Sequence, residues 1–292
     1  MHLISEISLA IILASLIIPL IKRNTFVYSM IVSNFILFFI SSIFSPDYIP
    51  AHSFILKELS FNPLYLKNPS MAYTIISSMF IHYDVMHLLG NMIALFFIGI
   101  PFEYRAGTIR VWLIYIFGGI FATLFFSLTN FEYTFLMGAS GAIFSLLGGF
   151  AASFPRDKIL IPVPLPIVIF AKMNVVTAAV LFGILQIIFS IVSPYGNIAY
   201  MAHLGGLVGG IFIAKLVVKE KKERFYDYSI VKNLIKNERQ MEIYRRIEEA
   251  EEQEIKEAWL SYLLKDLRCP YCNGKLELKN GKLYCRRCGY IK

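Results

Sequence analysis

Residues Phe135–Phe154 read FLMGASGAIFSLLGGFAASF, and a single hydroxyl near the start of this stretch, that of Ser140, guides the interpretation of the whole chain. Ser140 follows Gly138-Ala139 and precedes Gly141, where a long apolar run without a charge begins. A lone serine at such a place is usually a helix cap or a hydroxyl bonded back to its own helix. Here the chain also has a histidine and an asparagine upstream and a second histidine downstream, each in an apolar segment. These residues favour a chemical role for Ser140.

The composition divides the chain into two regions. Of its 292 residues, 57% are hydrophobic and only 16% are charged, which is more apolar than a soluble protein of this size needs. Residues 1–218 hold 10 Lys and Arg and 7 Asp and Glu, whereas residues 219–292 hold 18 and 13. We therefore expect a membrane region followed by a charged soluble tail. All four cysteines lie in the last 24 residues, so no disulfide framework supports the membrane region.

Seven apolar segments are candidates to cross a bilayer, which takes about 20 helical residues. They are Leu3–Ile21, Phe26–Phe44, Val85–Ile100, Arg110–Leu128, Ser140–Phe154, Met173–Val192 and Met201–Val218. The first could also be a signal peptide, but it has no basic start and no small-residue cleavage site, so we expect a spanning helix. Asp84 is a plausible cap for the third segment. Ile159–Ala171 has three prolines in five residues, which predicts a loop or an interfacial strip.

The basic residues of the membrane region predict its orientation. Two of them, Lys57 and Lys67, fall on one side, and eight fall at loops or helix ends on the other: Lys22, Arg23, Arg105, Arg110, Arg156, Lys158, Lys172 and Lys215. Because cytoplasmic loops carry an excess of Lys and Arg, we expect the N-terminus outside and the tail in the cytoplasm. The predicted localisation is a multi-pass protein of the cell membrane of a prokaryote.

With this orientation of the helices in the membrane, three polar groups lie at a similar depth near the outer leaflet. Ser140 begins the fifth segment, His203 begins the seventh, and His87 lies in the first turn of the third. The fifth segment has about 15 helical residues and spans about 22 Å, less than the hydrocarbon core of about 30 Å. Since it ends at the cytoplasmic face, it must begin below the outer surface, where irregular backbone needs protein or water around it. Hydrolysis would need the same water-filled depression.

Small residues predict close contact between the fifth and seventh segments. Gly206 and Gly210 lie on the helix face of His203, and the fifth segment carries a matching stripe of Gly141, Ser145, Gly148 and Ala152. Small residues let helix backbones approach closely, which could bring His203 within hydrogen-bond reach of Ser140. The histidine would then take the proton as the serine attacks a carbonyl carbon.

His87 and Asn91 are four residues apart and project from one helix face. They are either a structural hydrogen-bonding pair or, together with backbone N–H groups at the start of the fifth segment, donors to an oxyanion. The nucleophile elbow of soluble hydrolases is excluded, because position 142 is Ala and no strand precedes the serine. No carboxylate is placed to complete a triad, since Asp84 is better used as a cap and Glu103 lies at the far end of its segment. The sequence therefore predicts a dyad.

Three motifs, FIHYDVMHLLGNMIALFFIG, GASGAIFSLLG and AHLGGLVGG, occur in this order in three apolar segments. Together they resemble the rhomboid family of intramembrane serine proteases over about residues 26–218. The resemblance implies Ser140 as nucleophile, His203 as general base, and His87 and Asn91 as oxyanion-hole donors.

The resemblance has further implications for packing and partners. It implies that Phe144, one turn after the serine, stacks on the catalytic histidine, and that segments two to seven form a six-helix core beside one extra N-terminal helix. It also implies transmembrane protein substrates, cleaved in the lipid bilayer near the outer leaflet without a cofactor. A hypothesis of another class is a non-catalytic rhomboid-like scaffold that binds transmembrane helices in the same groove.

The tail combines a charged helical stretch with a cysteine-rich end. Residues 219–267 carry apolar residues at helical intervals, which predicts an amphipathic helix. A solvated spacer is the default interpretation, and a membrane-surface helix or a self-association element remain alternatives. Two CxxC pairs, Cys269 with Cys272 and Cys285 with Cys288, are separated by twelve residues and predict a structural zinc site in a zinc-ribbon-like module.

The expected cysteine module has a basic face formed by Lys275, Lys279, Lys282, Arg286, Arg287 and Lys292. A cytoplasmic protein partner or anionic lipid fits this face at least as well as nucleic acid, which we do not expect in a membrane-tethered tail. The predicted fold class is an all-α polytopic membrane protein followed by a helical linker and a small β zinc ribbon. Four parts are expected: residues 1–25, 26–218, 219–267 and 268–292.

Overall fold

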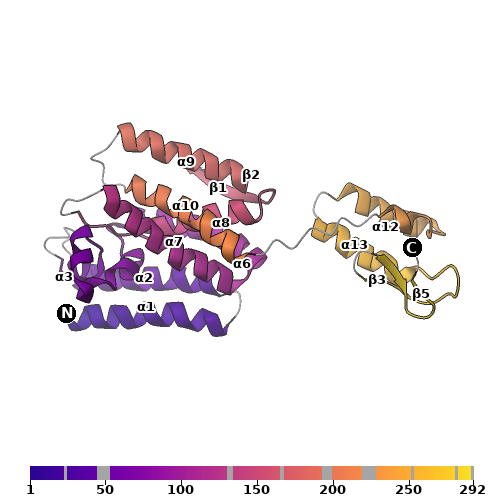
Figure 1. The fold of residues 1–292 in the computed structure, drawn as a ribbon, viewed down its shortest axis with the longest axis horizontal. Helices are drawn as coiled ribbons and strands as arrows, with labels where there is room; N and C mark the ends of the chain where they lie inside the picture. Colours follow the sequence, from indigo (N-terminus) through magenta and orange to yellow (C-terminus); the bar gives the residue numbers. More distant parts are fainter. Residues whose placement is uncertain are drawn as a thin grey trace. The chain divides into compact units, whose positions relative to one another are not determined.

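A computed structural model of the chain describes residues 1–22, 25–44, 53–129, 134–164, 168–192, 199–218, 228–250, 253–279 and 282–290. The chain forms two compact units, Met1–Lys219 and Glu220–Lys292 (Figure 1). The finer boundaries expected near residues 25 and 267 stay predictions. Arg23, one of the basic residues used to predict the orientation, lies outside the described residues.

Six helices among the described residues of the first unit are long and apolar enough to cross a membrane, so the chain is a multi-pass integral membrane protein. Five are α1 (Leu3–Ile21), α2 (Phe26–Phe44), α7 (Thr108–Thr129), α9 (Val175–Val192) and α10 (Tyr200–Val217). The sixth, Val85–Ala106, joins α5 (Val85–Ala94), a π-helical turn (Leu95–Gly99) and α6 (Ile100–Ala106). It therefore runs six residues past the expected end at Ile100.

The seventh apolar helix, α8 (Ser140–Ser153), has only 14 residues. Between α2 and α5 lie the short helices α3 (Phe54–Leu59) and α4 (Thr74–Ser77) and three 3₁₀ turns, Pro63–Lys67, Pro69–Met71 and Ser78–Phe80. These pieces have a small apolar core of their own, with Ile55, Leu56, Leu59 and Ile81. This core holds the loop against the end of the bundle at which α8 begins.

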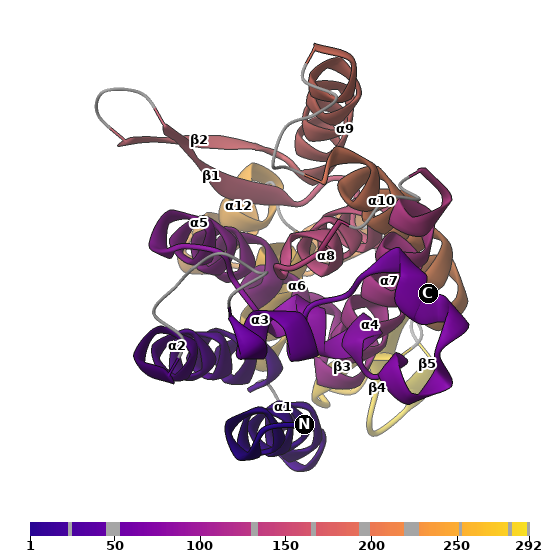
Figure 2. The same ribbon diagram turned by 90° about the vertical axis from the view of Figure 1, so that its left-hand side faces the viewer.

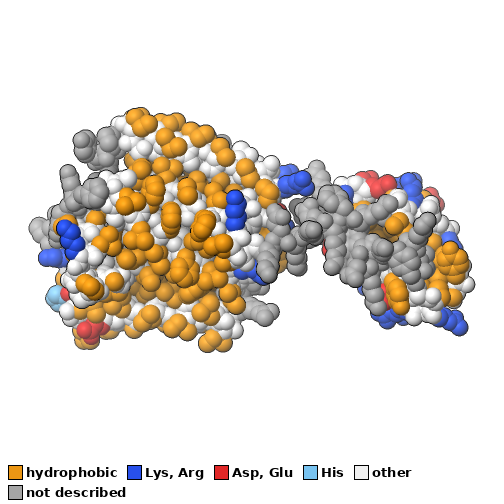
Figure 3. Space-filling view, viewed as in Figure 1, with side chains coloured by type: hydrophobic (Ala, Val, Ile, Leu, Met, Phe, Trp, Pro, Cys, Tyr) orange, Lys and Arg blue, Asp and Glu red, His pale blue; other side chains and the backbone are white. Residues whose placement is uncertain are grey.

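Hydrophobic side chains cover most of the face of the first unit drawn in Figure 3. Phe39 is 65% exposed, Ile191 74% and Phe212 62%. A soluble protein rarely exposes such a continuous apolar surface. Lipid is the solvent that suits this surface, in agreement with the six apolar spans.

The first helix packs against α2 and α7 through polar contacts as well as apolar ones. Pro19 has no N–H, so the carbonyl of Ser15 lacks its usual partner within α1. The Ser29 hydroxyl of α2 donates to that carbonyl at 3.1 Å. The indole N–H of Trp112 in α7 donates to the carbonyl of Leu16 at 3.0 Å. The extra helix is thus joined to two members of the expected six-helix core.

A buried carboxylate fixes the start of α2. The oxygens of Glu103, in α6, accept the backbone N–H groups of Phe26 at 3.0 Å and Val27 at 2.9 Å, and the Thr108 hydroxyl at 2.8 Å. The first N–H groups of a helix have no partner within it and carry a partial positive charge, so a carboxylate is well placed there. Glu103 therefore connects α2 to the α6–α7 turn.

The proline-rich segment expected to be a loop or interfacial strip is a β-hairpin. β1 (Lys158–Pro164) pairs antiparallel with β2 (Val168–Asn174), from Lys158 opposite Asn174 to Pro164 opposite Val168. Prolines are tolerated because both strands of a two-stranded ribbon are edge strands. Ile159 and Ile161 are buried, whereas Leu160 between them is 43% exposed. Figure 2 shows the hairpin reaching out from the helices, so the expectation of an all-α membrane region was wrong here.

The second unit joins helices and strands in one core. It contains α11 (Ser229–Lys232), α12 (Glu238–Glu249), α13 (Gln253–Asp266), and an antiparallel sheet of β3 (Leu276–Lys279), β4 (Lys282–Cys285) and β5 (Gly289–Tyr290) in that order. The core takes apolar residues from the three helices, the residue after α13, β3 and β4: Val231, Ile243, Tyr244, Ile247, Leu260, Leu263, Leu264, Leu267, Leu276 and Leu283. The helical stretch is therefore not a solvated spacer, because its apolar faces are buried against each other and against the sheet.

Candidate active site

Two side chains distant in sequence meet at one end of the membrane unit. Ser140 is the first residue of α8, and His203 lies in the first turn of α10. The Ser140 Oγ atom is 2.7 Å from Nε2 of His203, which is hydrogen-bond distance. With 14 residues, α8 is about 21 Å long at 1.5 Å per residue, shorter than a bilayer core of about 30 Å.

Glycines allow α8 and α10 to approach until their backbones touch. A Cβ atom on Gly206 would collide with the carbonyl oxygen of Gly141, and one on Gly210 with the carbonyl oxygen of Ser145. The Ser145 hydroxyl crosses to a third helix and donates to the carbonyl of Ile114 in α7 at 2.9 Å. These contacts set the distance between the two helices and hence the distance between Ser140 and His203.

The imidazole of His203 is 8% exposed and is held on three sides. Its ring stacks on Phe144, with centroids 4.6 Å apart and planes at 7°. Its Nδ1 atom is 2.7 Å from Oε1 of Gln186 in α9, while Nε2 faces Ser140. The sequence reasoning missed Gln186, and the available signal was a single amide in an otherwise apolar stretch of α9.

His87 and Asn91 lie beside the turn that precedes Ser140. Asp84 caps α5 by accepting the backbone N–H of His87 at 2.7 Å, as expected. Gly138 has a φ of +114°, and a Cβ atom there would be 2.6 Å from Nε2 of His87 and 3.4 Å from Nδ2 of Asn91. Among the described residues, the buried Nδ2 of Asn91 has no hydrogen-bond partner. A donor is therefore available at the start of α8.

The turn itself is held from two directions. The backbone N–H of Gly138 donates to the carbonyl of Ser78 at 2.9 Å, and Phe61 and Leu136 exchange backbone hydrogen bonds at 3.0 and 2.7 Å. Nε2 of His82 accepts the backbone N–H of Ala139, the residue before α8, at 3.5 Å. Within the part of the chain that the structure describes, the side chain of Ala139 makes no capping hydrogen bond. The N–H groups of the first turn of α8 are thus left to a group outside the helix.

A separate candidate site lies in the second unit. The sulfur atoms of Cys269, Cys272, Cys285 and Cys288 all lie within 4.8 Å of one another. The Sγ atoms are 3.5 Å apart for Cys269 and Cys288, and 3.4 Å for Cys272 and Cys285. A tetrahedral zinc site with Zn–S bonds of about 2.3 Å has sulfurs about 3.8 Å apart, so the four residues fit that ion.

The thiols also have electrostatics suited to a cation. Hydrogen bonds from the backbone N–H groups of Cys288 and Arg287 lower the pKa of the Cys285 thiol to about 6. The neighbouring Cys272, Cys269 and Cys285 side chains raise the pKa of Cys288 to about 12. Four crowded thiols cannot all ionise together unless a positive charge offsets their repulsion.

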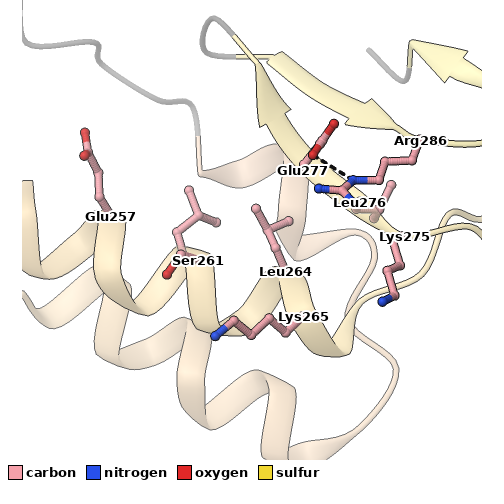
Figure 4. A pocket seen from close by; sticks show the side chains of 9 residues that line it. Glu257, Ser261, Leu264, Lys265, Lys275, Leu276, Glu277 and Arg286 are labelled. Atoms are coloured by element: carbon pink, nitrogen blue, oxygen red, sulfur yellow. Dashed lines mark hydrogen bonds and ion pairs between the residues drawn. The ribbon is translucent and has the colours of Figure 1, made fainter.

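The second unit also has a pocket of 510 Å³ between α13 and the sheet (Figure 4). Leu260, Leu264 and Leu276 give it an apolar floor continuous with the core. On its rim, Arg286 pairs with Glu277 at 2.9 Å. The lining contains none of the residues predicted to be catalytic or to bind metal.

Comparison with known protein families matches residues 69–220 to the Rhomboid domain. The match includes α5 to α10 and hence Ser140, His203, His87, Asn91 and Gln186. It covers more than half of the chain, and this protein belongs to the rhomboid family.

Among its relatives is RHOMBOID-like protein 4 of Arabidopsis thaliana, 44% identical over 78 residues, or 26% of this chain and 19% of that protein. Rhomboid protein 1, mitochondrial, of Saccharomyces cerevisiae is 32% identical over 162 residues, or 52% of this chain and 44% of that protein. Rhomboid-related protein 3 of Homo sapiens is 23% identical over 180 residues, or 58% of this chain and 44% of that protein. The chain thus matches less than half the length of each of these relatives.

Proposed function

We propose that this protein is an intramembrane serine protease in which Ser140 and His203 form a catalytic dyad. The observation that carries the proposal is the 2.7 Å distance between Ser140 Oγ and His203 Nε2 in a helical membrane unit. A serine hydroxyl becomes a strong nucleophile when a base within hydrogen-bond reach can take its proton. Membership of the rhomboid family supports the same assignment.

The proposed reaction uses both side chains of the dyad. As the Ser140 oxygen bonds to the carbonyl carbon of a peptide bond, its proton moves to Nε2 of His203. The resulting imidazolium returns that proton to the leaving amine nitrogen when the C–N bond breaks, which leaves an acyl-enzyme. Water, deprotonated by the same imidazole, then hydrolyses the ester and restores both side chains. No cofactor takes part in these steps.

The negative charge that develops on the carbonyl oxygen needs donors beside Ser140. Asn91 Nδ2 supplies a buried N–H without a partner in the described part of the molecule, and His87 lies next to it at Gly138. The first backbone N–H groups of α8 add the positive end of a helix dipole. We assign these groups to the oxyanion hole, because preorganised donors act most strongly where water is excluded.

The substrates of this site are transmembrane proteins, cleaved near the outer leaflet. Ser140 lies at the end of the short helix α8 opposite to Arg156 and Lys158, which precede and begin β1. Basic residues favour the cytoplasmic side, so we assign the Ser140 end to the outer side of a prokaryotic cell membrane and the tail to the cytoplasm.

The test compares single variants with the full-length protein in detergent. Ser140→Ala and His203→Ala should each abolish cleavage of a labelled single-span substrate while both variants still bind it and keep the thermal stability of the parent. A fluorophosphonate probe should label Ser140 in the parent protein only. Folded Ser140→Ala protein that still cleaves would overturn the proposal. Substrate binding without cleavage or labelling in the parent would instead identify a non-catalytic scaffold.

We further propose that Cys269, Cys272, Cys285 and Cys288 hold one structural zinc ion in a ribbon-like module. The mutual proximity of the four sulfur atoms supports this assignment. Zinc would neutralise the thiolates and link the sheet to the loop after α13, and a cytoplasmic protein would be the partner of the module. Metal analysis of the full-length protein should find one zinc per chain, and finding none refutes the site.

A further inference from the structure

Gln186 is the buried amide of a lipid-facing helix. It is 8% exposed, and the other buried residues of α9 are the apolar Val175, Ala178, Ala179 and Gly183. A buried amide without a partner costs about 1–3 kcal/mol, so its partner matters. That partner is Nδ1 of His203, at 2.7 Å from Oε1.

The bond determines which nitrogen of His203 carries the proton. A neutral imidazole has one N–H donor and one acceptor nitrogen, and an amide oxygen can only accept. Oε1 of Gln186 therefore pairs with an Nδ1–H group, which leaves Nε2 with its lone pair directed at the Ser140 hydroxyl. This is the tautomer that a general base for Ser140 requires.

We propose that Gln186 is the positioning residue of the catalytic base, a third member that replaces the carboxylate of a triad with a neutral amide. The inference rests on the proposed function, because it assigns His203 as the base. Gln186 keeps the proton on Nδ1 and holds the ring, already stacked on Phe144, in the plane that faces Ser140. Both ring nitrogens are thereby engaged, and among the described residues the ionisable side chain whose charge acts on His203 is His87 of α5.

An amide and a carboxylate differ in one measurable respect. Both accept from Nδ1–H and select the same tautomer, but only a carboxylate adds a negative charge beside the imidazolium. An opposite charge within hydrogen-bond distance favours the charged form of a titrating group by about 1–3 pKa units. Replacing the amide by a carboxylate should therefore raise the pH at which His203 becomes protonated.

The first experiment removes the acceptor and keeps the side-chain length. Gln186→Met in the full-length protein should lower kcat for a labelled single-span substrate by about 10–100-fold, the scale of losing a residue that orients an active-site histidine. KM should change little, and labelling of Ser140 by the fluorophosphonate probe should slow in parallel. The matched control is Ser190→Ala, one turn further along α9, whose hydroxyl donates to the carbonyl of Ile187 within the same helix. It should retain the parent kcat.

The second experiment separates positioning from mere packing. Gln186→Glu should retain most of the activity, and the acid limb of its kcat–pH profile should move to higher pH by about 1–3 units. A residue that only fills space would leave that limb in place. A kcat of Gln186→Met equal to that of the parent overturns the inference. An acid limb of Gln186→Glu at the same pH as that of the parent also overturns it. If the methionine variant does not fold, the glutamate variant alone decides the question. Failure of the proposed function shows itself separately, as a parent protein that does not cleave.

Discussion

Asn91 has a buried amide nitrogen beside the proposed nucleophile. Its Nδ2 is buried without a partner among the described residues, a situation that costs about 1–3 kcal/mol for an amide donor. The geometry places this donor 3.4 Å from the Cβ position of Gly138, at the turn into Ser140. The oxygen of a substrate carbonyl, as Ser140 attacks its carbon, would supply the missing acceptor.

Asn91→Ala should therefore lower kcat by about 10–1000-fold, on the scale of losing one oxyanion donor. KM should stay close to the parent value, since the bond forms with the developing charge and not with the ground-state carbonyl. Turnover and the apparent melting temperature in detergent are the measurements.

Asn34→Ala is the matched control, because its amide nitrogen donates to the carbonyl of Met30 within α2 at 2.7 Å. We expect it to lower the melting temperature and to leave kcat unchanged. An unchanged kcat in Asn91→Ala would return Asn91 to a structural role.

Residue type and spacing were enough to predict that some side chains of the candidate site lie close together, and not others. Ser140 and His203 stand in glycine-rich motifs with a resemblance to a known family, so their meeting could be expected. Gln186 has no such local signature, because its partner depends on how α9 is rotated against α10. Glu103 was seen only as a carboxylate at the far end of its segment. The N–H groups that donate to its oxygens belong to residues 77 and 76 positions earlier in the chain, so no local pattern reveals them.

At the scale of elements, the crossing of α8 and α10 depends on the absence of side chains. Gly210→Ala should push the helices apart, because the added methyl would overlap the backbone of Ser145. Small residues matter in membranes because packing, and not the hydrophobic effect, holds helices together there. We expect a lower melting temperature and a kcat reduced by at least about 10-fold, since small misplacements of reacting groups are costly to the rate.

Gly90→Ala provides the control for this substitution. A Cβ atom at Gly90 meets nothing within 4 Å, so the methyl group fits and alanine is favoured over glycine within a helix by about 0.5–1 kcal/mol. Its melting temperature should be equal to or slightly above that of the parent. If Gly210→Ala behaved like Gly90→Ala, the close crossing would not be needed.

The carboxylate of Glu103, at the start of α2, gives a second test at this scale. Glu103→Ala leaves the N–H groups of Phe26 and Val27 buried without acceptors, at a cost of about 1–3 kcal/mol for each unsatisfied group. The apparent melting temperature should fall clearly, whereas Glu6→Ala, which removes an exposed carboxylate from α1, should leave it unchanged. Equal melting temperatures for the two variants would contradict the capping role of Glu103.

Elements with strong local sequence signals were predicted well, and those that depend on pairing or packing between segments were not. The apolar runs gave α1 and α2 with the observed bounds, and Asp84 marked the start of α5 correctly. The hairpin was missed because three prolines argue against a strand, whereas the pairing of β1 with β2 places two of them, Pro162 and Pro164, in an edge strand. The tail helices show the helical period, but nothing local reveals that their apolar faces meet the sheet.

At the scale of the whole molecule, the two units should be separable in function. A chain truncated near Lys219 keeps every residue assigned to the catalytic site and removes all four cysteines. It should cleave the single-span substrate in detergent with a kcat within about 2-fold of the full-length value, because none of the assigned chemistry uses the metal. A stable but inactive truncated protein would show that the tail supports catalysis.

Cys285→Ser in the full-length chain tests whether the tail needs zinc to fold. Cys285 is fully buried in the same core as Leu276 and Leu283, and zinc modules lose their fold without the ion. The variant should lack zinc and expose the tail to rapid proteolysis while cleavage by the membrane unit persists. A tail that resists protease equally with and without zinc would mean that its helices fold without the ion.

The β1–β2 hairpin has a consequence for how deep the protein lies in a bilayer. Its free strand edges need water or lipid headgroups as hydrogen-bond partners. Exposed Leu160 and Phe170 favour the acyl boundary, and the exposed Lys158 and Lys172 beside them favour phosphate oxygens. Only the membrane–water interface satisfies both, so we expect the hairpin to hold one end of α8 at that level. Ser140 would then lie about 21 Å from it along α8, and a thicker bilayer would bury the serine deeper while a thinner one would bring it towards water.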